Sequence, residues 1–120
     1  MDLINLVYNT LSPLNVPILW QLRPTTLPGI TYHFFDESGE LFGEGQETLS
    51  MTSCQIDIWS KDNYTDLKKN VRKIMKSNGF LFANGFDSFE ADVNIYHKTL
   101  VFNYYYESEV MECQQILRKQ

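Results

Sequence analysis

The chain contains no apolar run close to the roughly 20 residues that a membrane-spanning helix needs. Its N-terminus also lacks the basic region and apolar core of a secretion signal. It has only two cysteines, Cys54 and Cys113, whose spacing matches neither a CxxC pair nor a metal site. These absences predict a soluble protein with reduced thiols and with no membrane among its partners, and the length of 120 residues predicts one domain.

Residues suited to catalysis are equally scarce. The chain has two histidines, His33 and His97, and each falls in a predicted strand, where a histidine is usually a surface or half-buried polar residue. The GxSxG, HExxH, EF-hand and phosphate-loop patterns are all absent. The GEG at residues 43–45 places a repelling glutamate where a phosphate would have to bind.

Six carboxylates raise the alternative of a magnesium-dependent nuclease, because Mg²⁺ prefers oxygen ligands. One of them, Asp57, falls on the solvent-facing side of its predicted strand. Asp87, Glu90 and Asp92 do not alternate in the way that would place all three on one face of a strand. We therefore predict solvated carboxylates, no metal, no cofactor and no enzymatic activity. The six are Asp57, Asp62, Asp66, Asp87, Glu90 and Asp92.

The most regular segment covers residues 54–80, where a strand leads directly into an amphipathic helix. Cys54, Ile56 and Ile58 alternate with polar residues, as in a strand with one buried face. Ser60 stands at the expected N-cap and Gly79 at the expected stop, so the pattern predicts a helix over 61–78. One side of this helix is apolar, and the neighbouring side is cationic. The cationic side carries Lys68, Lys69, Arg72, Lys73 and Lys76.

Acidic residues gather in a different segment. The net charge of −5 argues against a dedicated nucleic-acid-binding protein. Residues 37–46 are rich in glycine and are predicted to form a mobile hairpin loop that exposes Leu41 and Phe42. Such separation of charge is expected either from two solvated faces or from a contact between copies or with a partner. The acidic residues, with no Lys or Arg among them, are Asp36, Glu37, Glu40, Glu44 and Glu47.

The remaining patterns complete an α+β domain. Their order favours one antiparallel β-sheet with strands of mixed length and two helices packed on one face. We expect residues 1–106 to form this domain and residues 107–120 to form a C-terminal tail, either a short helix or a disordered segment. The first helix is predicted over 2–11, and the strands over 16–22, 30–36, 47–59, 80–89 and 91–106.

The order of these elements resembles that of the small tail-completion proteins of long-tailed bacteriophages, also called tail terminators or head–tail joining proteins. The likeness is carried by DIWSKD at residues 57–62, by the Lys-rich helix that ends in GF at residues 79–80, and by YHK at residues 96–98. It covers most of the chain, to about Tyr106. Its motifs are structural rather than catalytic.

The resemblance implies a hexameric ring that caps the tail tube, stops its polymerisation and joins the tail to the head connector. The implied place is the head–tail junction of the virion, after assembly in the host cytoplasm. The implied partners are other copies of the chain, the tail tube protein and the connector or neck proteins. DNA would pass through the ring without specific binding.

From the residues we expect the cationic side of helix 61–78 to meet the acidic segment of a neighbouring copy or of the adjoining ring. Leu41 and Phe42 would then be the apolar anchors of the contact, unless they pack against their own domain. Two alternatives remain open. One is a neck or connector component on the head side, and the other is a small nucleic-acid-binding regulator that uses helix 61–78 to contact phosphates.

Overall fold

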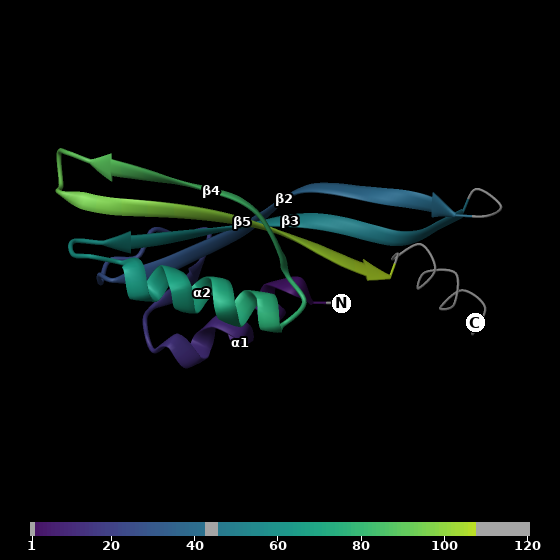
Figure 1. Cartoon of the computed structure of the whole chain (residues 1–120), viewed down its shortest axis with the longest axis horizontal. Coiled ribbons are helices and arrows are strands. Elements are labelled where there is room, and N and C mark those ends of the chain that lie inside the picture. Colours follow the sequence, from purple (N-terminus) through teal and green to yellow (C-terminus); the bar gives the residue numbers. More distant parts are fainter. Residues whose placement is uncertain (1, 43–45, 108–120) are drawn as a thin grey trace.

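Two helices pack on one face of a long five-stranded sheet (Figure 1). The computed structural model describes residues 2–42 and 46–107, and the side chains of these residues except 39–42 and 46–48. This arrangement confirms the predicted α+β class. The elements are α1 (Leu3–Leu11), a short 3-10 helix η1 (Ser12–Leu14), β1 (Ile18–Trp20), β2 (Gly29–Phe42), β3 (Gln46–Ser60), α2 (Thr65–Ser77), β4 (Leu81–Glu90) and β5 (Ile95–Glu107).

The strands lie in the order β1-β2-β3-β5-β4. All neighbouring pairs are antiparallel except β1 and β2, which are parallel. The sheet is therefore mixed, whereas the sequence predicted a wholly antiparallel one. The chain leaves β1 at Gln21, whose φ is 63°, and returns to the starting end before β2 begins. A Cβ at Gly29 would lie 2.6 Å from Pro24 Cβ, so this close return requires glycine.

The predicted loop over residues 37–46 is wrong. β2 continues to Phe42 and β3 begins at Gln46, so the acidic segment lies mainly in a hairpin, the β2–β3 arm (residues 36–42 and 46–52), which extends beyond the helices (Figure 1). An extra residue beside Asp36, whose φ is 57°, lets the ladder resume at Ser38 opposite Met51. Ladder hydrogen bonds to β3 thus override the turn-like composition of the segment.

The core lies between the helices and the sheet face that carries Ile56 and Phe102. Val7 and Leu11 enter it from α1, while Val71 and Met75 enter it from α2. Cys54 is fully buried there, as its strand parity predicted. Burial of these apolar side chains provides most of the driving force for folding.

The two ends of α2 differ in how well the sequence located them. Gly79 has a φ of 90°, which confirms the predicted stop. The start is displaced, because the Ser60 hydroxyl accepts a hydrogen bond from the backbone N–H of Asp62 at 3.1 Å and does not cap the helix. Instead, Asn63 Oδ1 accepts from the backbone N–H of Thr65 at 2.8 Å, and the helix begins there.

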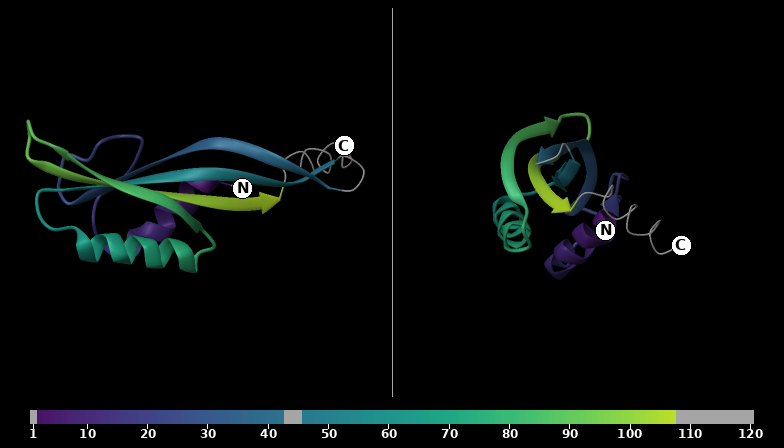
Figure 2. Two further views of the ribbon diagram at one scale, coloured as in Figure 1. Left: turned by 45° about the horizontal axis from the view of Figure 1, so that its top comes forward. Right: turned by 90° about the vertical axis from the view of Figure 1, so that its right-hand side faces the viewer.

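The sheet is strongly curled, as the end-on view in Figure 2 shows. Arg23, which follows β1, reaches Glu90 at the end of β4 with a distance of 2.6 Å, although β1 and β4 form opposite edges of the sheet. The curl shelters the face opposite the helices, which we call the open face. Asp57 lies on that face and is only 6% exposed, so the expectation of a solvated Asp57 is wrong.

Candidate functional site

The cationic side chains of α2 lie beside the edge strand β4. Val71 and Met75 point into the core and so fix the rotation of the helix. Of the five cations, Lys68 is half-buried and the other four are exposed. Within the described part of the chain, none of the five makes an ion pair. We call the α2–β4 surface the set formed by Lys68, Lys69, Arg72, Lys73, Lys76, Leu81, Phe82, Phe86 and Phe89.

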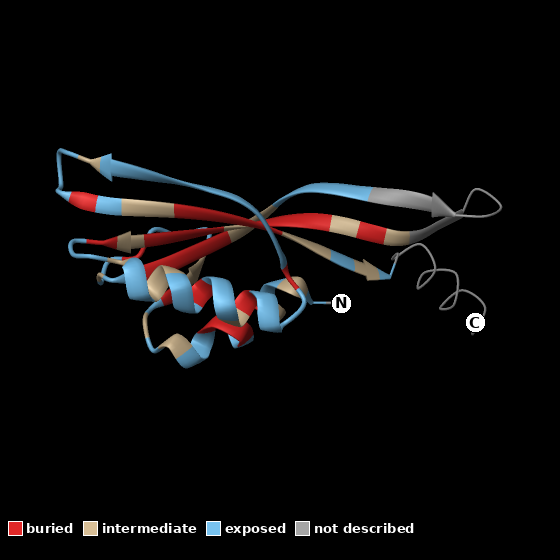
Figure 3. Cartoon of the chain, in the orientation of Figure 1, coloured by how far each residue is buried: buried red, intermediate tan, exposed pale blue. Residues whose placement is uncertain are grey.

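β4 is an edge strand of unusual character. All of its residues except Glu90 are exposed (Figure 3), including Leu81, Phe86 and Phe89 at 48–56%. Soluble proteins commonly protect such an edge with lysine, proline or a strong bulge. β4 contains no lysine or proline and has one irregularity, between Phe82 and Asn84. An uncovered edge with this many exposed apolar side chains is typical of a surface that is covered on assembly.

A groove of about 520 Å³ separates α2 from the start of β4. The Arg72 guanidinium lies 3.9 Å from the centroid of the Phe82 ring, in a cation–π contact. Lys73 and Lys76 line the same groove, together with Phe80 and Leu81. A groove with cations on one wall and apolar side chains on the other suits an acidic segment that also carries apolar residues.

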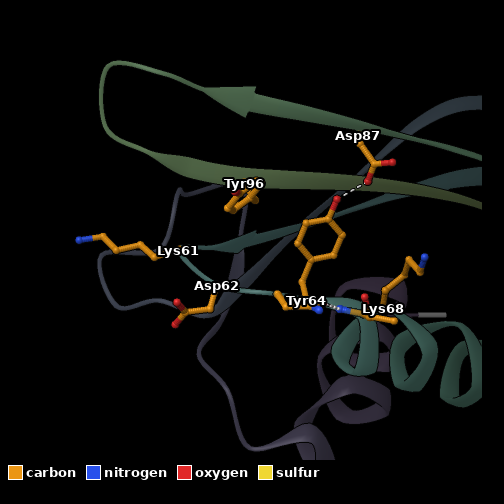
Figure 4. A pocket seen from close by; sticks show the side chains of 8 residues that line it. Lys61, Asp62, Tyr64, Lys68, Asp87 and Tyr96 are labelled. Carbon is orange, nitrogen blue, oxygen red and sulfur yellow. Dashed lines mark hydrogen bonds between the residues drawn. The ribbon is translucent and has the colours of Figure 1, made fainter.

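A second hollow, of about 490 Å³, lies at the start of α2 (Figure 4). The Tyr64 hydroxyl donates a hydrogen bond to Asp87 of β4, and Lys98 Nζ lies 3.4 Å from the same carboxylate. Burial, followed by the contact with Asp87, raises the pKa of Tyr64 to about 12. The Tyr64 hydrogen bond is the main cause that lowers the pKa of Asp87. This pair therefore holds a neutral phenol against a carboxylate and ties α2 to β4.

Replacing Tyr64 with phenylalanine should reduce the free energy of unfolding by about 1 kcal/mol, since it removes one surface hydrogen bond to a charged group. Urea denaturation measures this loss. Tyr96→Phe is the matched control, because Tyr96 lines the same hollow and its hydroxyl makes no hydrogen bond within the described residues. Equal losses from the two variants would contradict the role given to the Tyr64–Asp87 contact.

The open face carries a polar network that the sequence did not reveal. Asp57 Oδ1 lies 2.7 Å from His97 Nε2 and accepts a hydrogen bond from the Thr99 hydroxyl, also at 2.7 Å. The Ser88 hydroxyl lies 3.3 Å from His97 Nδ1, and the Trp59 ring stacks on His97 at 3.9 Å. The strand register explains the grouping, since Asp57 pairs with Thr99 and Ser88 pairs with His97.

The contacts run from Ser88 to His97 to Asp57, as in a nucleophilic triad. The three residues meet, however, because they lie on adjacent strands of the sheet. The network gives the buried Asp57 carboxylate its hydrogen-bond partners, which a buried charge requires. We therefore interpret it as structural. Among the side chains that the structure describes, no three His, Cys, Asp or Glu residues form a group that could hold a metal ion.

The residues predicted to form an interface separate into two places. The five cations of α2 lie together, whereas Asp36 and Glu37 are exposed on β2, with β3 and β5 between them and β4. Among the side chains that the structure describes, no contact within one copy therefore joins the two sets. The side chains of Glu40, Leu41, Phe42 and Glu47 and all of Glu44 lie outside the described part, as does the predicted tail beyond Glu107, which includes Cys113.

Comparisons with known proteins give a likeness in structure and none in sequence. No family model and no curated protein matches the chain. Among solved structures, the fold is similar to a chain from the virion of a native gene transfer agent particle, with a TM-score of 0.55. The match covers 85% of this chain and 92% of that chain at 12% identity. The likeness is one of fold.

None of the helices within residues 2–42 and 46–107 is long and apolar enough to span a bilayer.

Proposed function

We propose that this chain is a structural virion protein that completes a phage tail: copies form a ring on the tail tube, stop its growth and join it to the head connector. The observation that carries the proposal is the α2–β4 surface, where unpaired cations border an uncovered edge strand. The fold shared with a chain of a gene transfer agent virion supports the same class. The resemblance of the sequence to tail-completion proteins supports the finer assignment.

The proposed mechanism is geometric and electrostatic. Each copy presents one surface to its neighbour and a different surface to the other neighbour, and such a heterologous contact closes into a ring when the rotation is right. The cations of α2 form one partner of the contact, and the acidic β2–β3 arm forms the other. Hexameric size, the head–tail junction and the tail tube and connector proteins as partners belong to this proposal.

Fractionation of disrupted particles tests where the protein acts. Heads and tails of a phage that encodes this chain are separated on a gradient and probed with an antibody against the chain. We expect the chain in the tail fraction. Recovery with heads alone would support the alternative of a neck or connector component on the head side. Absence from both fractions would contradict a virion role.

A nucleic-acid-binding regulator remains the second candidate, because β4 places Phe82 directly beside Arg72, and exposed aromatic rings next to cations suit single-stranded nucleic acid. The helix itself carries no aromatic residue on its cationic side. The net charge of −5 opposes binding to phosphates over the rest of the surface. A salt-dependent shift of duplex or single-stranded DNA at low micromolar protein would favour this candidate.

A further inference from the structure

The sheet has two uncovered stretches of backbone edge. One is β4, whose outer side faces no other strand in the described part of the chain. The other is β2 beyond Tyr32, because β1 pairs only with residues Ile30 to Tyr32 and no described strand lies beside residues 33–42 on that side. The two stretches are equal in length and belong to opposite sides of the sheet. The N–H and C=O groups that point outward from these stretches are available for a further strand.

We propose that β4 of one copy pairs with residues 33–42 of β2 in the next copy, so that the sheets of all copies join into one continuous ring. This inference rests on the ring-forming function proposed above and specifies the contact that closes the ring. Backbone hydrogen bonds between strands supply the affinity in such edge-to-edge additions.

The strand directions suit this pairing. β2 and β5 run one way and β3 and β4 run the other, so β4 and β2 are antiparallel to each other. A sheet that continues around the ring axis keeps these alternating directions from copy to copy. It therefore brings β4 of one copy beside β2 of the next as an antiparallel pair, the arrangement already present at the three antiparallel pairs of the sheet.

The heights of the two edges set the tilt of the ring. Across the sheet Leu81 lies level with Phe35, and Phe86 lies level with Thr31. Only the first residues of β4 are therefore level with the free part of β2, which extends beyond them. Full overlap requires a displacement of about six residues, roughly 20 Å along the strands. Each copy contributes four strands to the ring, and at about 4.8 Å spacing their width is also roughly 20 Å. A displacement along the strands equal to this width corresponds to strands tilted by about 45° from the ring axis. Closed β-barrels have tilts of this size.

Charge identifies the occupant of the edge as a second copy. Lys68 and Lys98 lie at Asp87 of β4, and full overlap places the exposed Asp36 and Glu37 of β2 opposite this part of the strand. Within the described residues these two carboxylates make no ion pair. Pairing of β4 with a second β4 would instead bring two cationic helices together, and repulsion between like charges disfavours it.

Disulfide trapping tests the pairing. Ser88→Cys and Phe35→Cys are combined in the full chain, with Cys113→Ser removing a background thiol; Cys54 is fully buried and stays. Both new positions are exposed and belong to the open face, and full overlap places them opposite each other. Within one copy Ser88 lies level with Gly29, about six residues or 20 Å along the strands from Phe35, so no internal bond can form.

Oxidation of the purified variant with copper phenanthroline should give a ladder of disulfide-linked multimers that collapses on reduction. The matched control is Phe89→Cys with Phe35→Cys, because Phe89 is the neighbour of Ser88 but points to the opposite face. It should give no ladder. Equal ladders from both variants would reveal random collision and overturn the inference.

Native mass spectrometry of the same samples separates the possible failures. Oligomers without a Ser88–Phe35 crosslink would overturn the edge pairing and leave the ring function standing. A chain that stays monomeric at its highest soluble concentration and gives no crosslink would overturn the pairing as well. The fractionation of heads and tails does not depend on either result, so failure of the proposed function is recognised separately.

Discussion

Combining Lys69→Glu with Lys73→Glu is expected to leave the fold of the chain intact and to weaken its assembly strongly. Both lysines are exposed and make no ion pair within the described part of the chain, so their replacement should change the free energy of unfolding by less than about 0.5 kcal/mol. Facing an acidic arm, two new glutamates would add like-charge repulsion worth several kcal/mol. Association should then weaken by about two orders of magnitude. Analytical ultracentrifugation of the chain and phage titre measure the effect.

Two further variants separate charge from other effects of the substitution. Lys69→Arg with Lys73→Arg keeps the charge and should assemble like the parent. Asp36→Lys with Glu37→Lys, supplied in the same chain as the two lysine reversals, should restore association if the acidic arm is the partner surface. Normal assembly and titre from the Lys69→Glu, Lys73→Glu chain would contradict the electrostatic account.

The second large effect is expected at Asp57. Its carboxylate accepts hydrogen bonds from Thr99 and from Gln55, at 2.7 Å and 3.1 Å, and lies 2.7 Å from His97 Nε2. Asp57→Ala leaves these groups without their acceptor in a buried site, which should cost about 2–4 kcal/mol of stability. Urea denaturation measures the loss. Asp92→Ala, at an exposed position between β4 and β5, is the control and should have little effect.

The pH dependence of stability gives an independent test of the Asp57 network. Burial on its own would raise the pKa of Asp57, but the hydrogen bonds with His97, Thr99 and Gln55 together outweigh it and lower the pKa. The folded state therefore favours the carboxylate. Its contribution to stability is fully present above the unfolded pKa of about 3.9 and disappears as the pH falls through the lower folded value.

The stability difference between the parent and Asp57→Asn should accordingly shrink below about pH 4, because asparagine does not titrate. Denaturation curves collected from neutral to acidic pH give this difference directly. A difference that stays constant down to the acid limit would show that the charge of Asp57 contributes nothing to stability.

Local patterns in the sequence predicted the elements that carry the core. Alternation over Cys54, Ile56 and Ile58 located β3, and Gly79 located the end of α2. Both depend on neighbours in the chain, which is why period and capping chemistry were sufficient. The cationic side of α2 followed from the same helical period.

Features that depend on distant partners were not predictable in this way. The acidic segment became part of a hairpin because β3 supplies a ladder for it. Asp57 became buried because it lies on the sheltered face of the curled sheet, where His97, Thr99 and Gln55 contact its carboxylate. The network of Asp57 and His97 depends on the register of β3 with β5. The alternation of residues along a strand shows on which face each one lies, but it does not show which residue of the next strand is its partner. The register of the strands could therefore not be predicted from the sequence.

The function proposed for the chain makes use of these placements. The cations of α2 and the described acidic residues Asp36 and Glu37 occupy separate regions of one copy, so contact between them would require a second copy. The uncovered edges of β2 and β4 give the same contact a backbone component. Electrostatics would then select the partner surface, and strand pairing would hold the ring closed.

The most direct test of the account is electron microscopy of a lysate from a phage that encodes this chain, with its gene stopped by a nonsense codon. The account predicts full heads separated from free tails, and tails of uncontrolled length. Suppression of the codon should restore joined particles of normal length. Intact virions in normal number without the chain would contradict its role in completing the tail.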